Sequence, residues 1–590
     1  MAKKILSGNE AVAYAAFASG INVVSSYPGT PSTEIMEYLK QFPEIYAEWS
    51  VNEKVGMEVA IGASLAGARS MTTMKHVGLN VAMDPLMTFA YVGALGAMVV
   101  VSADDPGMHS SQNEQDNRNI AKFARISMFE PSSSQEAFDM FKEAVKVSEE
   151  IKLPVLFRMT TRVCHSSSVV EIGDFKRDKT SKKEYIKDIT KTCPIPAIAK
   201  IMRVELEKKL EKLTEISEKS SFNKEELESD KSFGVITSGV SYEYVKEIIP
   251  KGNVLKLGMT FPIPLHKIKT FASKVEKLYV IEEGDKYLED QINAFGIKTE
   301  STTTSLRIGE LNPDRINDFY CEIKGECAGI DARKDFIKGL PNRPPVLCPG
   351  CSHRPIFYAL NKLNAIVTGD IGCYSLGLLK PLDALDTIIC MGGGVTNAYG
   401  FEKAGETRPV VGIVGDSTFF HSGITGLINM LYNKSKGTII ISDNRITAMT
   451  GHQDNPGTGK TLMGEDTVIV DIEALCKGIG VKRVRTIDPY NIDDTIKAIK
   501  EETESNELSV IIAKFPCMLT GVKTIRRFKI NTEKCRACGQ CFKLGCQAIL
   551  RGQAADNQNK RFKAEIDPVL CVGCGMCNQL CKFDAIEETI

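Results

Sequence analysis

The stretch from Cys535 to the C-terminus contains eight of the chain's 18 cysteines, in two runs of nearly the same spacing. In each run two residues separate the first three cysteines, and a fourth cysteine follows slightly further on. Three thiolates spaced in this way can wrap around one cubane, and the distant fourth cysteine then ligates the other cluster. The spacing therefore predicts two 4Fe–4S clusters. One set of ligands is Cys535, Cys538, Cys541 and Cys581, and the other is Cys571, Cys574, Cys577 and Cys546.

Two details depart from the usual two-cluster ferredoxin pattern. The first run has four residues before its fourth cysteine, and Gln547 and Lys582 replace the proline that usually follows. Neither change removes a ligand. Zinc sites are the alternative, but zinc favours two separated cysteine pairs over three evenly spaced cysteines and a fourth. We therefore predict a two-cluster ferredoxin domain over residues 526–590, in a protein that transfers electrons.

Length and composition limit what the rest of the chain can be. A chain of 590 residues is expected to form about three to five domains, and its 43% apolar content suffices for hydrophobic cores. The net charge of −1 argues against a nucleic-acid-binding protein, because no basic domain could neutralise phosphates. The N-terminus has no cleavable signal pattern, and no apolar run approaches the roughly 18–20 residues that span a bilayer. These features predict a cytoplasmic protein with no disulfide framework and no membrane or nucleic-acid partner.

The body of the chain alternates short apolar strands with helical stretches, which is typical of parallel α/β domains. Strands are predicted at 20–25, 98–102, 410–414 and 437–442, and the charged stretch 205–231 is predicted to be a solvated helix or linker. We predict a multidomain α/β chain. Its parts are α/β segments at 1–180, 232–330 and 331–525, a charged helical linker at 181–231, the cluster domain, and a Pro-containing linker at 333–345.

A second motif lies at the ends of two predicted strands. Gly415 and Asp416 follow the strand at 410–414, and Asn444 comes 28 residues after Asp416, behind the strand at 437–442. The carboxyl ends of parallel strands meet at one edge of a sheet, where open α/β folds bind ligands. Oxygen atoms gathered at such an edge suit Mg²⁺, which needs hard oxygen ligands in an octahedron and can bridge a diphosphate to the protein.

This layout resembles the thiamine diphosphate signature, in which a Gly-Asp pair is followed about 25–30 residues later by Asn. By that pattern Asp416 and Asn444 supply side-chain oxygens to Mg²⁺, and Ile446 supplies its backbone carbonyl. Ser417 stands where many members have glycine, which leaves the metal ligands intact. The alternative is that Gly-Asp and Asp-Asn are ordinary turn pairs.

Three glycines upstream fit the same interpretation. Gly392, Gly393 and Gly394 follow a predicted strand at 387–390 and open a predicted helix, where N–H groups can approach a diphosphate. A glycine triplet by itself is weak support for a binding site.

Glu53 is the candidate acid for thiamine chemistry. Thiamine becomes a carbanion when a carboxylic acid beside its aminopyrimidine holds the imino tautomer. Glu53 follows a strand-like stretch at 44–49 and begins a helix rich in small residues, as that glutamate does in thiamine enzymes. The alternative is a surface carboxylate that the helix macrodipole favours.

Six further motifs, together with the features above, resemble the thiamine-diphosphate-dependent 2-oxoacid:ferredoxin oxidoreductases over essentially the whole chain. The motifs are Tyr27-Pro-Gly-Thr-Pro-Ser-Thr-Glu34, Asn52-Glu53, Lys75-His-Val-Gly-Leu-Asn-Val-Ala82, Asp104-Asp-Pro-Gly-Met-His109, Asp116-Asn-Arg118 and Cys348-Pro-Gly-Cys351. More narrowly, two thiamine domains fused to a ferredoxin domain are similar to the large (alpha) subunits of the indolepyruvate branch of that family.

The resemblance implies a domain plan and a reaction. Residues 1–180 would form a pyrimidine-type thiamine domain, 232–330 a transketolase C-terminal-like domain, and 331–525 a diphosphate- and Mg-binding thiamine domain. The reaction would convert an arylpyruvate and coenzyme A to an acyl-CoA and CO₂, with the electrons passed through iron–sulfur clusters to an external ferredoxin. A smaller beta subunit is also implied, which makes the protein a hetero-oligomer.

The resemblance also assigns residues to the substrate. Thr30 and Arg118 would contact its carboxylate or carbonyl, and an Arg fork suits a carboxylate because it can bind both oxygens. The alternative for Arg118 is a surface ion pair with Asp116 or Glu114. His76 and His109 are weaker candidates for lining the site.

A third 4Fe–4S cluster is the boldest expectation, because a cluster close to thiamine would accept electrons that the C-terminal domain lies too far away to receive directly. Related oxidoreductases place their last ligand of such a cluster just beyond the thiamine motif. An alternative is that the first two cysteines bind nothing, since a lone C-x2-C pair is weak and buried cysteines often act as small hydrophobes. The four candidate ligands are Cys348, Cys351, Cys373 and Cys517. The cysteines expected to be structural are Cys164, Cys193, Cys321, Cys327, Cys390 and Cys476.

Other function classes explain less of the chain. A non-redox thiamine decarboxylase would not need eight ferredoxin cysteines, and a polyferredoxin would not need Asp416, Asn444 or a long α/β body. A sibling oxidoreductase for pyruvate, 2-oxoglutarate or a branched-chain 2-oxoacid remains the closest alternative, because it would differ only in the shape of the substrate pocket.

Overall fold

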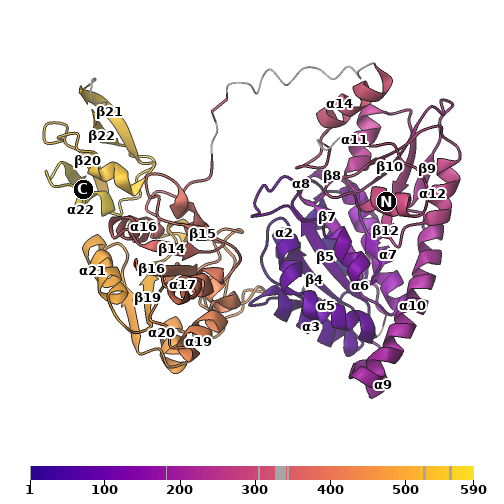
Figure 1. Ribbon diagram of the computed structural model, residues 1–590, viewed down its shortest axis with the longest axis horizontal. Helices are drawn as coiled ribbons and strands as arrows, with labels where there is room; N and C mark the ends of the chain where they lie inside the picture. Colours follow the sequence, from indigo (N-terminus) through magenta and orange to yellow (C-terminus); the bar gives the residue numbers. More distant parts are fainter. Residues whose placement is uncertain are drawn as a thin grey trace. The chain divides into compact units, whose positions relative to one another are not determined.

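The computed structural model describes residues 2–180, 182–302, 306–325, 340–341, 344–522, 526–556 and 561–589. The chain divides into two compact units, Met1–Gly339 and Leu340–Ile590, coloured indigo to pink and pink to yellow in Figure 1. Most of the linker predicted at 333–345 lies outside the described residues. Each unit is built around a mainly parallel sheet, as the alternation of strands and helices predicted.

The first unit contains a seven-stranded sheet in the order β12-β6-β7-β5-β4-β2-β3. Neighbouring strands from β6 to β3 are parallel, and β12 pairs with β6 in the antiparallel direction. The strands predicted at 20–25 and 98–102 are confirmed as β2 and β5, whereas β12 comes from a segment of the chain beyond residue 232. The bounds are β2 Val23–Ser26, β3 Tyr46–Trp49, β4 Ser70–Lys75, β5 Met98–Asp104, β6 Met128–Phe129, β7 Val155–Thr160 and β12 Met259–Phe261.

Helices cover this sheet and explain its continuous apolar strands. All seven residues of β5 are buried, which is typical of a parallel strand covered on both faces. Helices α3 (Glu53–Leu65) and α5 (Met83–Val92) share one core with β5. Helix α7 (Ser134–Ile151) lies against β5 and β7 and packs on α1 (Gly8–Ala18) (Figure 1).

A second, four-stranded sheet completes the first unit, in the order β13-β10-β11-β9. Helix α10 (Pro196–Lys219) contacts α5 and α12 (Leu265–Ala272), and its Leu206 and Leu213 are buried. The helical interpretation of the charged stretch is therefore confirmed for α10, but one side of this helix packs into the unit instead of facing solvent. No helix among the described residues is both long enough and apolar enough to cross a membrane. The strands are β9 Lys224–Glu226, β10 Gly234–Ser238, β11 Asn253–Leu257 and β13 Leu278–Ile281.

The second unit contains a six-stranded parallel sheet in the order β15-β14-β16-β17-β19-β18. Neighbouring residues of β17 point to opposite faces, so Ile440 joins one core while Ile439 and Ile441 join the other. The strands predicted at 410–414 and 437–442 are confirmed as β16 and β17. The bounds are β14 Ile366–Gly369, β15 Thr387–Ile388, β16 Val410–Gly415, β17 Thr438–Asp443, β18 Arg483–Ile487 and β19 Ser509–Lys514.

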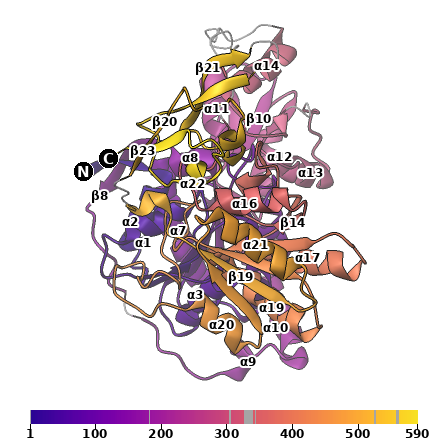
Figure 2. The same cartoon turned by 90° about the vertical axis from the view of Figure 1, so that its left-hand side faces the viewer.

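Helices lie on both faces of this sheet. Helices α16 (His353–Lys362) and α21 (Ile492–Thr503) share one core, and α17 (Gly393–Lys403) and α19 (Ile424–Tyr432) share the other. Figure 2 shows α20 (Ile472–Gly478) and α21 beside β19. The cysteine-rich end of the chain adds two antiparallel pairs. They are β20 Arg527–Ile530 with β23 Ile586–Thr589, and β21 Ile549–Asp556 with β22 Arg561–Ile566.

Two buried arginines carry ion pairs through the interior of the first unit. Arg118, which is 1% exposed, donates to both carboxylate oxygens of Asp116 and to Glu282 just beyond β13. Arg158 on β7 donates to Asp104 and Glu130. Burial raises the pKa of Asp116, but the charges of Arg118 and Arg158 outweigh it and bring this pKa to about 2. These pairs therefore link the large sheet to the end of a strand in the small one.

Replacing Arg118 by Met should destabilise the first unit strongly. The change leaves the carboxylates of Asp116 and Glu282 buried without their cation, which costs about 3–5 kcal/mol in free energy of unfolding. Arg162→Met is the matched control, because Arg162 binds Glu310 with a side chain that is 51% exposed, and it should cost less than about 1 kcal/mol.

Urea unfolding followed by the fluorescence of Trp49, the chain's single tryptophan, reports on this unit alone. Equal losses for the two variants would show that the buried pairs do not hold the two sheets together.

Candidate active site

Three residues, Asp416, Asn444 and Ile446, meet at the carboxyl edge of the second unit's sheet. Gly415 on β16 is in register with Ser442 on β17, so the loops that follow both strands leave the sheet side by side. The side-chain amide of Asn444 lies 3.3 Å from Asp416 Oδ1 and 2.8 Å from the carbonyl oxygen of Ile446, and its nitrogen can be oriented to donate to both. The structure thus brings together the three residues that the sequence assigned to Mg²⁺.

The electrostatics at this edge suit a cation. Burial, followed by the charge of Asp443, raises the pKa of Asp416 to about 7. The other oxygen of Asp416, Oδ2, accepts a hydrogen bond of 3.1 Å from Asn455, which is 9% exposed. Sequence reasoning missed Asn455, which lies in an ordinary Asn-Pro-Gly turn and carries no motif signal. A buried carboxylate is costly unless a cation or donor compensates it, so these donors and oxygens fit a divalent metal.

The glycine triplet begins α17, as predicted, but its N–H groups are in part already bonded. Gly392 N donates to Asp370 Oδ2 at 2.7 Å, and Gly394 N also interacts with that carboxylate. Gly392 has φ of 79°, which favours glycine, and a Cβ at Gly394 would lie 2.7 Å from the Ile413 carbonyl oxygen. Burial raises the pKa of Asp370 to about 7. The sequence motif Gly369-Asp370 held the signal for this acceptor, which sequence reasoning did not use.

The four cysteines predicted for a third cluster come from three parts of the same unit. Cys373 follows β14, Cys517 follows β19, and Cys348 and Cys351 lie in the turn before α16. Cys517 N donates to the carbonyl oxygen of Asn444, one of the three residues at this edge. Burial, together with the nearby thiols of Cys373 and Cys348, raises the pKa of Cys351 to about 12. Cys517 likewise interacts with Cys373 and Cys348, so all four sulfurs gather in one region.

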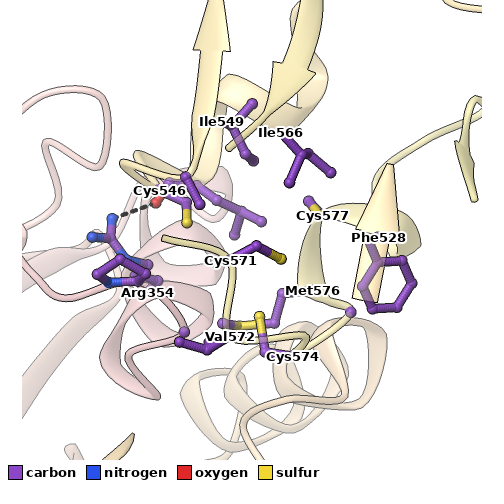
Figure 3. A pocket seen from close by; sticks show the side chains of 15 residues that line it. Arg354, Phe528, Cys546, Ile549, Ile566, Cys571, Val572, Cys574, Met576 and Cys577 are labelled. Carbon is purple, nitrogen blue, oxygen red and sulfur yellow. Dashed lines mark hydrogen bonds between the residues drawn. The ribbon is translucent and has the colours of Figure 1, made fainter. Parts of the chain in front are cut away.

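Each predicted C-terminal cluster has its own cavity. In Figure 3, the sulfur-bearing side chains of Cys546, Cys571, Cys574 and Cys577 surround one cavity together with apolar side chains such as Phe528 and Ile566. The other cavity is lined by Cys535, Cys538, Cys541 and Cys581. In each case the fourth cysteine comes from the other run, which is the pairing that the spacing predicted.

No group of three or more His, Cys, Asp or Glu side chains in the described part of the chain is placed to bind one single ion. The first cavity also contacts Pro349 and Gly350 of the loop that carries Cys348 and Cys351, so two of the predicted cluster sites are neighbours.

The other cysteines show no comparable grouping. Cys164 and Cys476 are buried, and Cys193 and Cys390 are exposed. Cys321 is disulfide-bonded, which the expectation for a reducing compartment did not foresee. Cys327 lies outside the described residues.

Glu53 begins α3 and is 5% exposed, so it is not the surface carboxylate of the alternative interpretation. Asn52 caps this helix by accepting a hydrogen bond from Val55 N. The carboxylate of Glu53 lies against Gly78 in α4 (His76–Val81), where an added Cβ would be 2.6 Å from Glu53 Oε1. Gly78 therefore makes room for the candidate acid, and sequence reasoning missed that role.

The residues predicted to meet the substrate are placed very differently from one another. Thr30 lies in the loop after β2, and its carbonyl oxygen is 3.5 Å from Ser110 Oγ. Arg118 forms an ion pair with Asp116, one of the two partners of the alternative interpretation. The predicted surface location is wrong, because the pair is buried, and the second partner is Glu282. His76 and His109 also differ in burial: His76 is fully buried, whereas His109 is half exposed and lies beside Glu310.

Comparison with known proteins agrees with these features. The family model for the C-terminal TPP-binding domain of thiamine pyrophosphate enzymes matches residues 370–513. The thiamine-diphosphate-binding model of pyruvate flavodoxin/ferredoxin oxidoreductases matches residues 14–221, and a 4Fe-4S binding domain matches residues 564–587. The chain therefore carries thiamine-binding and iron–sulfur domains in a single α/β polypeptide.

Full-length relatives identify the family. Indolepyruvate oxidoreductase subunit IorA of Methanothermobacter marburgensis is 40% identical, over 99% of this chain and 97% of its own. The protein of the same name from Pyrococcus horikoshii is 39% identical over the same shares. A solved 2-oxoglutarate:ferredoxin oxidoreductase from Magnetococcus marinus is 18% identical and covers 54% of this chain and 65% of its own, with a TM-score of 0.45 that is too low to support an argument. The chain belongs to the indolepyruvate oxidoreductase IorA-subunit family, within the thiamine-diphosphate-dependent 2-oxoacid:ferredoxin oxidoreductases.

Proposed function

We propose that this enzyme subunit oxidises arylpyruvates of the indolepyruvate type to acyl-CoA and CO₂. The observation that carries the proposal is its full-length similarity to subunits named for indolepyruvate. The two electrons released would pass through iron–sulfur clusters to ferredoxin. A smaller partner subunit and coenzyme A complete the reaction, because the relatives are named as subunits and the acyl group needs an acceptor.

The residues divide the chemistry between them. Thiamine diphosphate, when bound, supplies a carbanion that attacks the 2-oxo carbon and a cationic ring that accepts the electrons left by CO₂. Asp416 and Asn444 would hold Mg²⁺ through their side-chain oxygens and Ile446 through its carbonyl oxygen; the proximity of the three residues supports this. Glu53, which is 5% exposed, would interact with the aminopyrimidine of the cofactor and hold the imino tautomer.

A third cluster would connect this chemistry to the C-terminal domain. The sulfurs of Cys348, Cys351, Cys373 and Cys517 gather beside the Asn444 loop. The loop that carries Cys348 and Cys351 also lines the cavity of the predicted Cys546 cluster, through Pro349 and Gly350. Three clusters in this order would offer the electrons a sequence of short transfers toward the outermost site, near the exposed Cys538.

An anaerobic assay of the complex with its partner subunit tests the function. Several 2-oxoacids are compared as coenzyme-A-dependent reductants of a viologen dye. Indolepyruvate and phenylpyruvate are expected to give the highest kcat/KM. A much higher value for pyruvate, 2-oxoglutarate or a branched-chain 2-oxoacid would assign the chain to a sibling activity.

Replacing Gly78 by Ala should slow turnover because the new methyl group forces the Glu53 carboxylate to move. We expect a loss in the range of about 10²–10⁴-fold typical of lost acid–base catalysis, similar to that of Glu53→Gln. Gly62→Ala, on α3 itself, is the matched control because nothing lies within 4 Å of its added Cβ. Turnover and thermal stability are measured together. Wild-type turnover in Glu53→Gln would remove Glu53 from the mechanism.

Iron content should distinguish three clusters from two. Three cubanes correspond to about twelve irons per chain, and Cys351→Ser should lower this to about eight. Cys193→Ser, at an exposed cysteine far along the chain, should keep all of the iron. Iron analysis of anaerobically purified protein is the measurement, and about eight irons in both the wild type and Cys351→Ser would confine the clusters to the C-terminal domain.

A further inference from the structure

Lys75 is the last residue of β4 and lies among the strand ends that carry the substrate candidates. Its Nζ donates to the carbonyl oxygen of Ser110 at 2.6 Å and to Ser110 Oγ at 3.1 Å. Ser110 Oγ in turn lies 3.5 Å from the carbonyl oxygen of Thr30. An added Cβ at Gly29 would be 3.1 Å from the Cβ of Lys75, so the backbone beside Thr30 runs close to this lysine. Lys75 and Thr30 therefore border the same small region of the sheet edge.

The Lys75 ammonium has an unusual environment for a cation. Among the described residues no carboxylate lies within ion-pair distance of it, and its acceptors are a carbonyl and a hydroxyl oxygen of Ser110. Burial lowers the pKa of Lys75 to about 8, and only partial compensation comes from the charge of Asp105. Asp105 is itself bonded to Ser110 N, Ser111 Oγ and Thr161 Oγ1. Lys75 is half-buried, and its hydrogen bonds to Ser110 lie at the surface, where a ligand can reach the ammonium. A lysine ammonium that has no carboxylate within ion-pair distance can bind an anionic ligand.

The arginine that the resemblance assigned to the substrate is bound elsewhere. Arg118 is 1% exposed, and its donors are used by Asp116, Glu282 and the carbonyl oxygens of Glu283 and Asp285. Moving this guanidinium onto a substrate would leave those carboxylates buried without a cation.

Every 2-oxoacid carries a carboxylate, whatever its side chain, so its binding site needs a cation or a set of hydrogen-bond donors. We propose that Lys75, rather than Arg118, binds the carboxylate of the 2-oxoacid substrate, with the Thr30 loop beside it. This inference rests on the proposed 2-oxoacid oxidation, but it does not depend on which 2-oxoacid is preferred. Glu53 and Lys75 then have different roles, because Glu53 interacts with the cofactor and Lys75 binds the substrate.

The test uses the complete complex and a matched pair of inhibitors. An arylpropionate keeps the carboxylate but lacks the reactive 2-oxo group, and its primary amide lacks the negative charge as well. The inhibition constants of both are measured in the wild type, in Lys75→Met and in Lys75→Arg. Lys209→Met is the control, because Lys209 is another half-buried lysine whose Nζ donates to a backbone carbonyl, that of Lys152.

In Lys75→Met we expect the Ki of the acid and the KM of the 2-oxoacid to rise about 10- to 100-fold, as for a lost hydrogen bond to a charged group. The Ki of the amide and the KM of coenzyme A should not change. Lys75→Arg should keep part of the preference for the acid, and Lys209→Met should keep all of it. If Lys75→Met does not fold, Lys75→Gln provides the neutral side chain.

An unchanged ratio of the two inhibition constants in the neutral variants would overturn the assignment of Lys75 while the proposed oxidation stands. A wild-type complex that oxidises no 2-oxoacid would overturn the proposed function and this inference together.

Discussion

The parallel direction of neighbouring strands determines where the chemical groups of this chain meet. In the second unit Gly415 is in register with Ser442, and Ser442 with Ala513, so the loops after three strands leave the sheet at one edge. In the first unit the same rule brings the ends of β2, β4 and β5 together, and with them Thr30 and Lys75. Ligands of open α/β sheets bind beyond such carboxyl ends, because the backbone there turns away and leaves its polar groups exposed. Residues distant in sequence can therefore share one site, although no sequence motif connects them.

Buried charges divide into two groups in this protein. Arg118 is compensated by Asp116 and Glu282, so its charge stabilises the junction between two sheets and is not free for a ligand. Asp416 is buried as well and Lys75 is half-buried, but their contacts include no ion pair of comparable quality among the described residues. Uncompensated buried charge destabilises a folded chain, and binding sites are where such destabilisation is offset by a ligand of opposite charge. The contrast separates a structural arginine from a candidate substrate-binding lysine.

The candidate site was partly visible in the sequence. The interval between Asp416 and Asn444 predicted an oxygen cluster because two strand ends of a parallel sheet must approach each other. The glycine triplet predicted a tight helix start, but it did not reveal that Asp370 already accepts its N–H groups. Asn455 and Gly78 were missed because each acts through one close contact that no local pattern encodes.

The sequence by itself determined the features that depend on local geometry. The spacing of Cys535, Cys538 and Cys541 predicts a cluster because three thiolates on one short loop must reach the same cubane. Apolar runs of four to seven residues likewise predict buried strands, since both faces of a parallel sheet are covered. Only the tertiary structure decided that β12 joins the large sheet and that α10 packs against it. It also decided which cation is free, because Arg118 meets Glu282 through folding of segments 164 residues apart, a contact that local sequence does not specify.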